Sequence, residues 1–418
     1  MKNSTLRLIA LALVATCTCA SAAPLRIVAC EAQVPSKKRG VCENSLSAQD
    51  FRALAPGVSW YYNWHFKADN IPPAGVDMTF IPMAWGNRPG DVSGVASYLA
   101  GAQKKPPVVL AINEPNLKGQ AFIDPETTAE LFKKIKAVAD RYNVPVAGPN
   151  MSLGSAEGDS IKAVDPLTHE KTTYTFMIPF LKAFFHYMGA TKVDAVAYHS
   201  YGNIGELKWA TGEMAKQFGR PVWVTEYAQW NVPSVEAARD YLIEATDFLE
   251  RSPDVQGYAW FKERAKDNPK ISLLDRQPGK LSILGEAYVN LPPHDADIYY
   301  RLPGKLNASK FVRASGMDIK TTKDKEGFFD LAVSGNGGSA DYNIQVDAAG
   351  PCTVRVRAAG EGTINLQSGG KTLGTAQLAK KTGWQDVEAK VQFAAGPQTL
   401  RVTTQGLVLR IHSVEFAK

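Results

Sequence analysis

The chain has 418 residues, of which 47 are Lys or Arg and 41 are Asp or Glu, so its formal net charge is +6. Because these basic residues are scattered rather than gathered on one face or in one motif, the composition argues against a nucleic-acid partner. No segment after the amino terminus holds an uninterrupted apolar run of about 20 residues, so we expect no membrane span, and the length favours two domains.

The first element in the chain is a short export signal. A basic start precedes an apolar run at 8–15, and small residues occupy the cleavage positions up to Ala22. This pattern predicts a signal peptide over 1–22 and a secreted or periplasmic location. A lipoprotein signal at Cys17 or Cys19 competes with this interpretation, although threonine stands where a smaller residue usually precedes the lipidated cysteine.

Short apolar runs alternate with longer segments of helical period from about residue 39 to 290. Capping residues such as Ser47, Asp124 and Ser234 begin several of the helical segments. Strand and helix repeated eightfold predict a closed (β/α)8 TIM-type barrel over 23–290. An open doubly wound sheet is the competing fold, but no strand is followed by a Gly-rich phosphate loop. The eight expected strands are 39–42, 58–64, 78–85, 108–113, 144–148, 193–199, 222–226 and 255–261.

The carboxyl-terminal quarter has a different period. The stretch 291–305 is rich in Pro and charge and is expected to be a linker. Beyond it, over 306–418, apolar and polar residues alternate with period two between Gly- or Pro-bearing turns, which predicts an all-β sandwich of the jelly-roll kind. The expected strands there are 342–346, 353–357, 363–366, 385–393, 399–402 and 408–416.

Three cysteines remain once the signal is removed. Cys30 and Cys42 are expected to form a disulfide in an oxidising compartment, where closure of so small a loop contributes roughly 3 kcal/mol. Cys352 would then be a buried free thiol, and three buried thiols are the alternative. Because no Cys/His cluster has metal-ligand spacing, we expect neither a metal nor a cofactor.

Two carboxylates stand at the ends of expected barrel strands. Glu114 follows the run 108–113, and Glu226 ends the run 222–226. For either residue alone a solvated surface group is the ordinary alternative, but the active site of such a barrel lies at the carboxyl ends of its strands. Glycoside cleavage needs a proton donor and an attacking carboxylate, and we assign these roles to Glu114 and Glu226 respectively. Opposed strands suit a separation of about 5 Å, the retaining geometry.

Further residues near these strand ends could bind sugar. Asn113 is placed to bond a 2-hydroxyl, and His199 or Tyr201 could fix the Glu226 carboxylate or a sugar hydroxyl. Flat aromatic faces stack on pyranose rings, and four tryptophans lie at or just past strand ends, whereas Trp60 and Trp223 are expected in the core. The remaining candidates are Trp64, Trp85, Trp230, Trp260 and Asn63.

Several short sequence motifs along residues 37–290 resemble those of glycoside hydrolase family 128. They are Lys38-Arg39-Gly40-Val41, Trp60-Tyr61-Tyr62-Asn63-Trp64, Phe80-Ile81-Pro82-Met83-Ala84-Trp85, Asn113-Glu114-Pro115-Asn116, Tyr198-His199-Ser200-Tyr201 and Trp223-Val224-Thr225-Glu226. The resemblance implies a small clan A barrel, retaining endo-β-1,3-glucanase activity, Glu114 as acid/base, Glu226 as nucleophile and β-1,3-glucan as substrate. Cys42-Glu43-Asn44 departs from the family pattern. A clan A hydrolase of another β-glycan and a non-catalytic β-glucan-binding protein remain the alternatives, and endo and exo action stay open.

The region 306–418 resembles carbohydrate-binding module family 6. The sequence motifs that carry this resemblance are Asp341-Tyr342-Asn343-Ile344-Gln345-Val346, the segment 349–357, Thr382-Gly383-Trp384-Gln385 and Gly396-Pro397-Gln398-Thr399-Leu400. It implies a sugar held between Trp384 and either Phe328 or Phe329. Near Asn307 the chain lacks the acidic residue that the family uses for a structural calcium. Glycan binding and a purely structural role are both open, and we expect a monomer.

Overall fold

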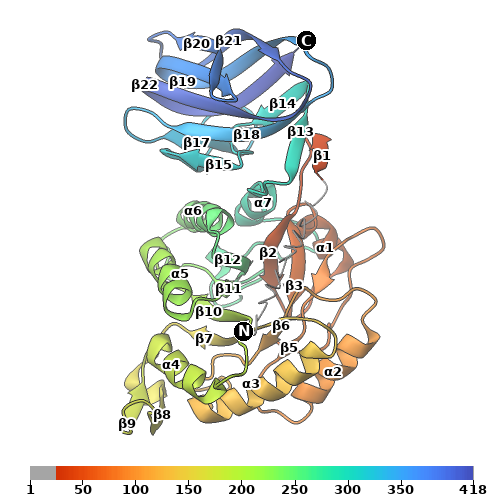
Figure 1. Ribbon diagram of the computed structural model, residues 1–418, viewed down its shortest axis with the longest axis vertical. Coiled ribbons are helices and arrows are strands. Elements are labelled where there is room, and N and C mark those ends of the chain that lie inside the picture. Colours follow the sequence, from red (N-terminus) through yellow and green to blue (C-terminus); the bar gives the residue numbers. More distant parts are fainter. Residues whose placement is uncertain (1–24, 418) are drawn as a thin grey trace, which may run out of the picture.

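The computed structural model describes residues 25–417, so the expected signal peptide lies outside the described residues. An α/β domain occupies one end of the molecule and a β-rich domain the other (Figure 1). Among the described residues, no helix is both long enough and apolar enough to cross a membrane.

A single curled parallel sheet organises the α/β domain. Its strand order is β4, β3, β2, β12, β11, β10, β7, β6, β5, and every one of the eight expected strands is present. The expected strand 78–85 is divided at Ile81 and Pro82 into β4 and β5, which form the two edges of the sheet. The strands are β2 Ser36–Cys42, β3 Val58–Tyr62, β4 Thr79–Phe80, β5 Met83–Ala84, β6 Val109–Ala111, β7 Val146–Ser152, β10 Ala195–Ser200, β11 Val222–Tyr227 and β12 Val255–Trp260.

The expected eightfold repeat is not complete. In the part of the chain that the structure describes, residues 63–78 between β3 and β4 form a loop instead of a helix. Pro72, Pro73 and Gly75 lie in this loop, and proline both removes a helical hydrogen bond and clashes with the preceding turn. The paired strands form a curled half-barrel whose two edges, β4 and β5, are not paired with each other. A complete (β/α)8 barrel is therefore not confirmed. The helices are α1 Ala48–Leu54, α2 Asp91–Gly101, α3 Pro125–Asp140, α4 Met177–Met188, α5 Ile204–Phe218, α6 Val235–Arg251 and α7 Ile283–Asn290.

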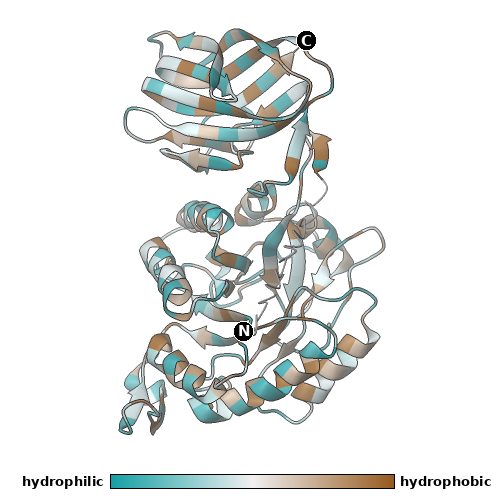
Figure 2. Cartoon of the chain, viewed as in Figure 1, coloured by the Kyte–Doolittle hydropathy of each residue, from teal (hydrophilic) through white to brown (hydrophobic). Residues whose placement is uncertain are grey.

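Hydrophobic side chains fill the space inside the sheet and the layer between sheet and helices. Trp60 and Trp223, both expected in the core, are 1% and 5% exposed, and their tilted rings pack with centroids 5.5 Å apart. A side chain at Gly257 would meet the Trp223 ring at 2.3 Å, so only glycine fits there. The helices carry hydrophobic and hydrophilic residues side by side in Figure 2, as elements with one buried face should.

The β-rich domain is built around one 11-stranded sheet. Predicted turns near Gly360 and Gly406 are instead crossed by continuous long strands, β19 and β22. The strands are β13 Ile298–Arg301, β14 Gly304–Asn307, β15 Arg313–Ser315, β16 Met317–Thr321, β17 Phe329–Val333, β18 Ser339–Val346, β19 Gly350–Ser368, β20 Lys371–Leu378, β21 Trp384–Phe393 and β22 Gly396–Ala417, while a separate hairpin, β8 Ile161–Val164 with β9 Lys171–Tyr174, precedes α4.

The two ends of the described chain share this sheet. Strand β1, Arg26–Ala29, pairs in parallel with β13. The segment 291–305 therefore contains β13 and the start of β14, and it is not the open linker that its composition suggested. Lys310 ties the same junction together, since its Nζ donates to the carbonyls of Cys30 at 2.7 Å and Ala32 at 2.8 Å.

The expected disulfide between Cys30 and Cys42 is absent, and both are free buried thiols. The thiol of Cys30 lies beside β13, 3.2 Å from the carbonyl of Arg301. By contrast, Cys42 ends β2 inside the other domain, with its thiol 3.3 Å from the carbonyl of Trp260. Because β1 is recruited to the β-rich sheet, the two cysteines belong to different packing environments.

Candidate active site

The backbone around Glu114 is bent sharply just after β6. Ile112 and Glu114 have φ values of 61° and 44°, a left-handed region that costs non-glycine residues on the order of 1–3 kcal/mol each. Three backbone hydrogen bonds hold this bend: Ile112 N–H to Ala84 O at 2.8 Å, Asn113 N–H to Trp85 O at 2.7 Å, and Glu114 N–H to Asn150 O at 2.7 Å. The neighbouring strands therefore impose the direction in which Glu114 projects.

Glu226, on β11, is surrounded by hydrogen-bond donors. Trp64 Nε1 donates to its Oε1 at 2.6 Å, and the Tyr62 hydroxyl lies 3.2 Å from the same oxygen. The Tyr201 hydroxyl donates to Oε2. Burial, together with the adjacent Glu226 charge, raises the pKa of both tyrosines well above the ordinary value, so they keep the protons that they donate. This arrangement stabilises negative charge on Glu226.

His199 lies between the two carboxylates. Its Nδ1 is 2.8 Å from Glu114 Oε1 and 3.4 Å from Glu226 Oε2, and its backbone is in register with Glu226 on the adjacent strand. Burial lowers the pKa of His199, but the charges of Glu226 and Glu114 outweigh this effect, so the net pKa is raised above the ordinary value. A positive ring would reduce the repulsion between the two glutamates.

Glu114, His199 and Glu226 offer one ligand atom each within 4.8 Å of one another, a spacing that could hold a metal ion. The sequence placed all three residues at strand ends, but no metal-ligand spacing was evident because they lie far apart along the chain. Two of the three are carboxylates, and the donors around Glu226 already occupy both of its oxygens. The contacts therefore suit a pair of carboxylates bridged by a histidine.

A cavity of about 590 Å³ opens above these groups. Among the expected site residues, seven line it and His199 lies directly behind. Asn113 Oδ1 is buried there without a hydrogen-bond partner in the described chain, while its Nδ2 donates to Gln120 at 3.1 Å. The expected residues in the lining are Trp64, Trp85, Asn113, Glu114, Tyr201, Glu226 and Trp230.

Two expected sugar-binding residues do not reach the cavity. Trp260 is fully buried, and its Nε1 donates to the carbonyl of Ile271 at 2.7 Å, so it packs in the core instead of acting as a platform. Asn63 is 6% exposed and donates to Lys67 O at 2.9 Å and Asp69 Oδ2 at 2.8 Å, so it holds its own loop.

Some lining residues were not foreseen. Phe261 lines the cavity where Trp260 was expected, because side chains alternate along a strand and the next residue points the other way. Ser152 was missed because β7 runs four residues beyond the expected end at 148. Leu117 and Gln120 lie in the loop after Glu114, and no pattern in the sequence marked them.

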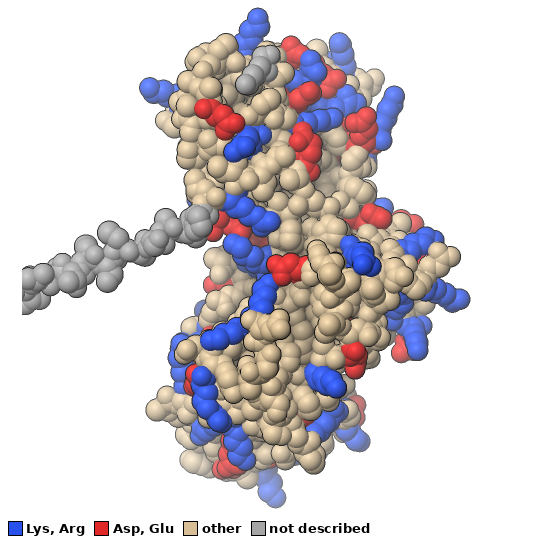
Figure 3. All heavy atoms as spheres, turned by 90° about the vertical axis from the view of Figure 1, so that its right-hand side faces the viewer, with Lys and Arg blue, Asp and Glu red and all other residues tan. Residues whose placement is uncertain are grey.

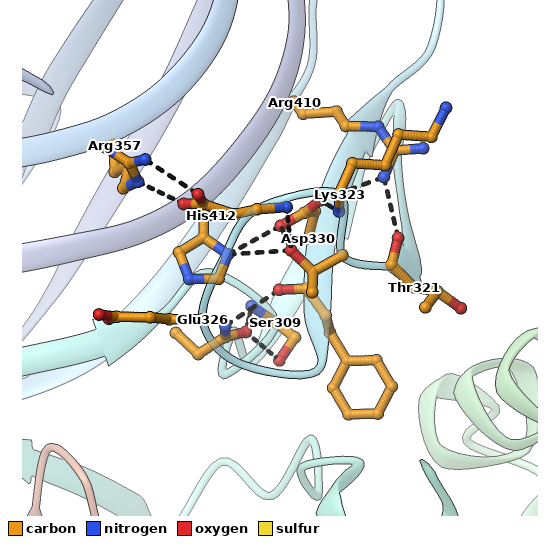
Figure 4. A network of polar contacts seen from close by, with 12 residues as sticks. Ser309, Thr321, Lys323, Glu326, Asp330, Arg357, Arg410 and His412 are labelled. Carbon is orange, nitrogen blue, oxygen red and sulfur yellow. Dashed lines mark hydrogen bonds and ion pairs between the residues drawn. The ribbon is translucent and has the colours of Figure 1, made fainter. Parts of the chain in front are cut away.

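The β-rich domain holds a second group of candidates. Phe329 is only 3% exposed, so it cannot cover a sugar, whereas Phe328 is 45% exposed. Trp384 packs edge-on against His412 at 5.8 Å. His412 belongs to the polar network of Figure 4, where buried Asp330 accepts from His412 Nδ1 at 2.8 Å and from Arg410 Nη1 at 3.1 Å.

Comparisons with known proteins find a matching family for each of the two domains. A family described as glycosyl hydrolase catalytic core matches residues 40–288, and carbohydrate binding module (family 6) matches residues 307–418. A GH128 (subgroup II) endo-β-1,3-glucanase from Pseudomonas viridiflava is 31% identical, with a TM-score of 0.54 over 62% of this chain and 100% of that chain. The corresponding enzyme from Sorangium cellulosum is 28% identical, with the same TM-score and the same coverage.

A curated relative is more distant. Alkali-sensitive linkage protein 1 of Schizosaccharomyces pombe is 24% identical over 244 residues, which is 56% of this chain. The chain spans only 40% of the length of that relative.

Proposed function

Because the chain belongs to the glycosyl hydrolase catalytic-core family, and within it to glycoside hydrolase family 128, we propose that this glycoside hydrolase is a retaining β-1,3-glucanase. Its catalytic carboxylates would be Glu114 and Glu226. Carbohydrate-binding module family 6 follows at residues 307–418.

The observation that carries the retaining mechanism is the separation of the two carboxylates. Their nearest oxygens lie within 4.8 Å of each other. Retaining enzymes hold these groups about 5–5.5 Å apart, whereas inverting enzymes need about 6.5–9.5 Å to admit a water molecule. The spacing favours direct attack on the sugar by one glutamate.

The hydrogen bonds suggest how the roles divide. Glu226, with donors on both oxygens, attacks the anomeric carbon and forms a covalent glycosyl-enzyme while the glycosidic C–O bond breaks. Glu114, contacted by His199 alone among the side chains of the described residues, gives its proton to the departing oxygen. In the second step Glu114 takes a proton from water, and the resulting hydroxide displaces Glu226 from the sugar. Asn113 Oδ1, which lacks a partner, would accept a bond from the sugar 2-hydroxyl.

Product stereochemistry tests this mechanism. We expect NMR of a laminarin digest to show the β-anomer first, and Glu226→Gln and Glu114→Gln each to abolish release of reducing sugar. With Glu226→Gly, added azide should restore turnover and give an α-glucosyl azide. Initial release of the α-anomer would refute the retaining mechanism.

The substrate is proposed from the relatives and from the cavity. The two structural relatives named above are endo-β-1,3-glucanases. Trp64, Trp85, Trp230 and Phe261 line the cavity with flat faces suited to pyranose rings. Rates on laminarin, curdlan, xylan and mixed-linkage glucan separate β-1,3-glucan from another β-glycan, and the product lengths from curdlan distinguish endo from exo action.

The rest of the proposal concerns the setting of the enzyme. We expect export, with mature protein beginning at Ala23, and a monomer in solution. The curled sheet would close as a (β/α)8-type barrel with one helix replaced by a loop. Backbone hydrogen bonds on both sides of the β4–β5 break support this closure: Ile81 N–H to Tyr61 O at 2.9 Å and Leu110 N–H to Pro82 O at 3.0 Å.

In the β-rich domain, Phe328 and Trp384 would bind glycan. A curdlan pull-down of the Phe328→Ala variant would test this.

A further inference from the structure

A second hollow, of about 710 Å³, opens at the opposite end of the curled sheet. Its walls come from the amino ends of β2, β3 and β4 and from the segments that precede these strands and β6, together with Arg26 and Arg52. Since all strands of this sheet are parallel, their amino ends lie on the side opposite the carboxyl ends that carry Glu114 and Glu226. The hollow is therefore separate from the catalytic cavity.

The lining of this hollow is strongly basic. Five exposed cations and one carboxylate, Asp77, line the hollow, and Asp295 and Asp297 lie beside Lys37 just outside it, whereas the whole chain has 47 basic and 41 acidic residues. A concave surface lined by one sign of charge focuses the electric field and concentrates counter-ions. The five cations are Arg26, Lys37, Arg52, Lys104 and Lys105.

Most of this charge is not neutralised locally. Lys104 pairs with Asp77 at 2.6 Å, and Lys37 pairs with Asp295 at 3.0 Å. No carboxylate among residues 25–417 lies within ion-pair distance of the other three cations, which are Arg26, Arg52 and Lys105. Figure 3, which views the molecule from one side, likewise shows Lys and Arg side chains outnumbering Asp and Glu over the α/β domain.

Apolar residues line part of the hollow. Pro35, Pro56 and Pro107 fix the backbone around it, and Trp60 lies beneath. A preformed hollow with a cationic rim needs little rearrangement to accept a ligand. Guanidinium groups bind the oxygens of sulfate and phosphate in pairs, so the rim suits such groups better than it suits neutral sugar.

We propose that this hollow binds a polyanionic chain that carries sulfate or phosphate groups. The site is independent of the proposed glucanase activity, because it shares no residue with the catalytic cavity. A neutral β-1,3-glucan has no anionic group that could pair with the three unpaired cations of the hollow. The enzyme would thus be held on an acidic matrix through one end of its α/β domain while the other end faces glucan.

Binding of two probes, a heparin dodecasaccharide and a polyphosphate of similar length, to the whole protein tests this proposal. The triple variant Arg26→Gln, Arg52→Gln, Lys105→Gln removes the unpaired cations, all of which are exposed. A matched control, Lys380→Gln, Lys381→Gln, Lys390→Gln, removes the same charge from exposed positions of the β-rich domain. Laminarihexaose serves as the neutral probe.

We expect the triple variant of the hollow to bind at least one polyanion about 10-fold or more weakly than wild type, because three surface charge contacts are lost. The control variant should bind as the wild type does. Wild-type binding should weaken steeply with salt, because exposed charges are screened. The probe that binds more tightly identifies sulfate or phosphate as the preferred group. Equal losses in both variants, or no binding of either polyanion, would overturn the proposal. Glucanase activity should be the same in all three proteins.

Discussion

Asp50 offers a direct test of the electrostatics that hold the loop after β12 in place. Its carboxylate accepts hydrogen bonds from Arg264 Nη2 at 2.8 Å, Gly279 N–H at 2.7 Å and Ser47 N–H at 2.9 Å. Asp50 thereby connects the start of α1 to the segment that follows Phe261 of the active-site cavity. Burial raises the pKa of Asp50, but these bonds more than offset burial and lower the pKa from 3.8 to about 2.

The size of the effect follows from that difference. At about 1.4 kcal/mol per pH unit, the ionised carboxylate contributes roughly 2 kcal/mol to the free energy of unfolding. Because the folded pKa is the lower one, this contribution is complete above pH 3.8 and is lost as the pH falls through about 2. At pH 3 about half of it should remain.

The perturbation is Asp50→Asn, and the assay is urea unfolding at pH 7, 5, 4 and 3. We expect the variant to be less stable by roughly 2 kcal/mol at pH 7 and 5, with the gap narrowing below pH 4. Asp77→Asn, at a carboxylate that is 86% exposed, is the control and should change stability by less than about 1 kcal/mol. If the difference in the free energy of unfolding between wild type and variant stayed constant, or grew at pH 3, the assignment of an ionised Asp50 would be refuted.

Three further predictions concern buried or aromatic groups. Burial and the nearby Glu43 charge raise the pKa of the fully buried Glu263 well above 4.5, so the folded protein loses stability as the pH rises above 4.5. Glu263→Gln should therefore be more stable than wild type, by a margin in the free energy of unfolding that grows as the pH rises above 4.5, and a margin that does not change with pH would contradict this. Trp64→Phe deletes a bond to the Glu226 charge, so kcat/KM on laminarin should fall about 10- to 100-fold, and an unchanged rate would exclude a role for this donor. Phe329→Ala should lower the melting temperature, whereas Phe328→Ala should weaken curdlan binding at unchanged melting temperature; the reverse pattern would mean that their roles are exchanged.

Local patterns were enough to identify the strands of the α/β domain. Buried parallel strands are nearly continuous apolar runs, and all eight of the expected runs carry strands. Strand β1 was missed because its partner, β13, lies some 270 residues later in the chain. No local pattern encodes such a pairing. The Cys30–Cys42 disulfide was wrong for the same reason, since sequence spacing says nothing about the sheet to which β1 belongs.

Strand ends were predicted more reliably than the directions of their side chains. Glu114, Glu226 and Tyr201 all line one cavity, as the expected strand ends implied. Trp260 was predicted to line the cavity, and its neighbour Phe261 lines it instead, because a shift of one residue moves a side chain to the opposite face of a strand. Only the fold shows which of two adjacent aromatic residues points into the cavity.

The distance between the two carboxylates depends on a residue that bears neither of them. Asn150, on β7, donates from Nδ2 to Ala111 O at 2.8 Å and accepts from Thr225 Oγ1 at 2.9 Å. The backbone carbonyl of Asn150 also accepts a hydrogen bond from the Glu114 N–H. A single buried amide thus connects the strand end before Glu114 to the residue before Glu226, across the inside of the curled sheet. Neither of the two strands encodes that connection by itself, because the separation of the carboxylates arises only when β6, β7 and β11 come together. The separation of the two carboxylates is for this reason a property of the folded α/β domain rather than of either glutamate's sequence context.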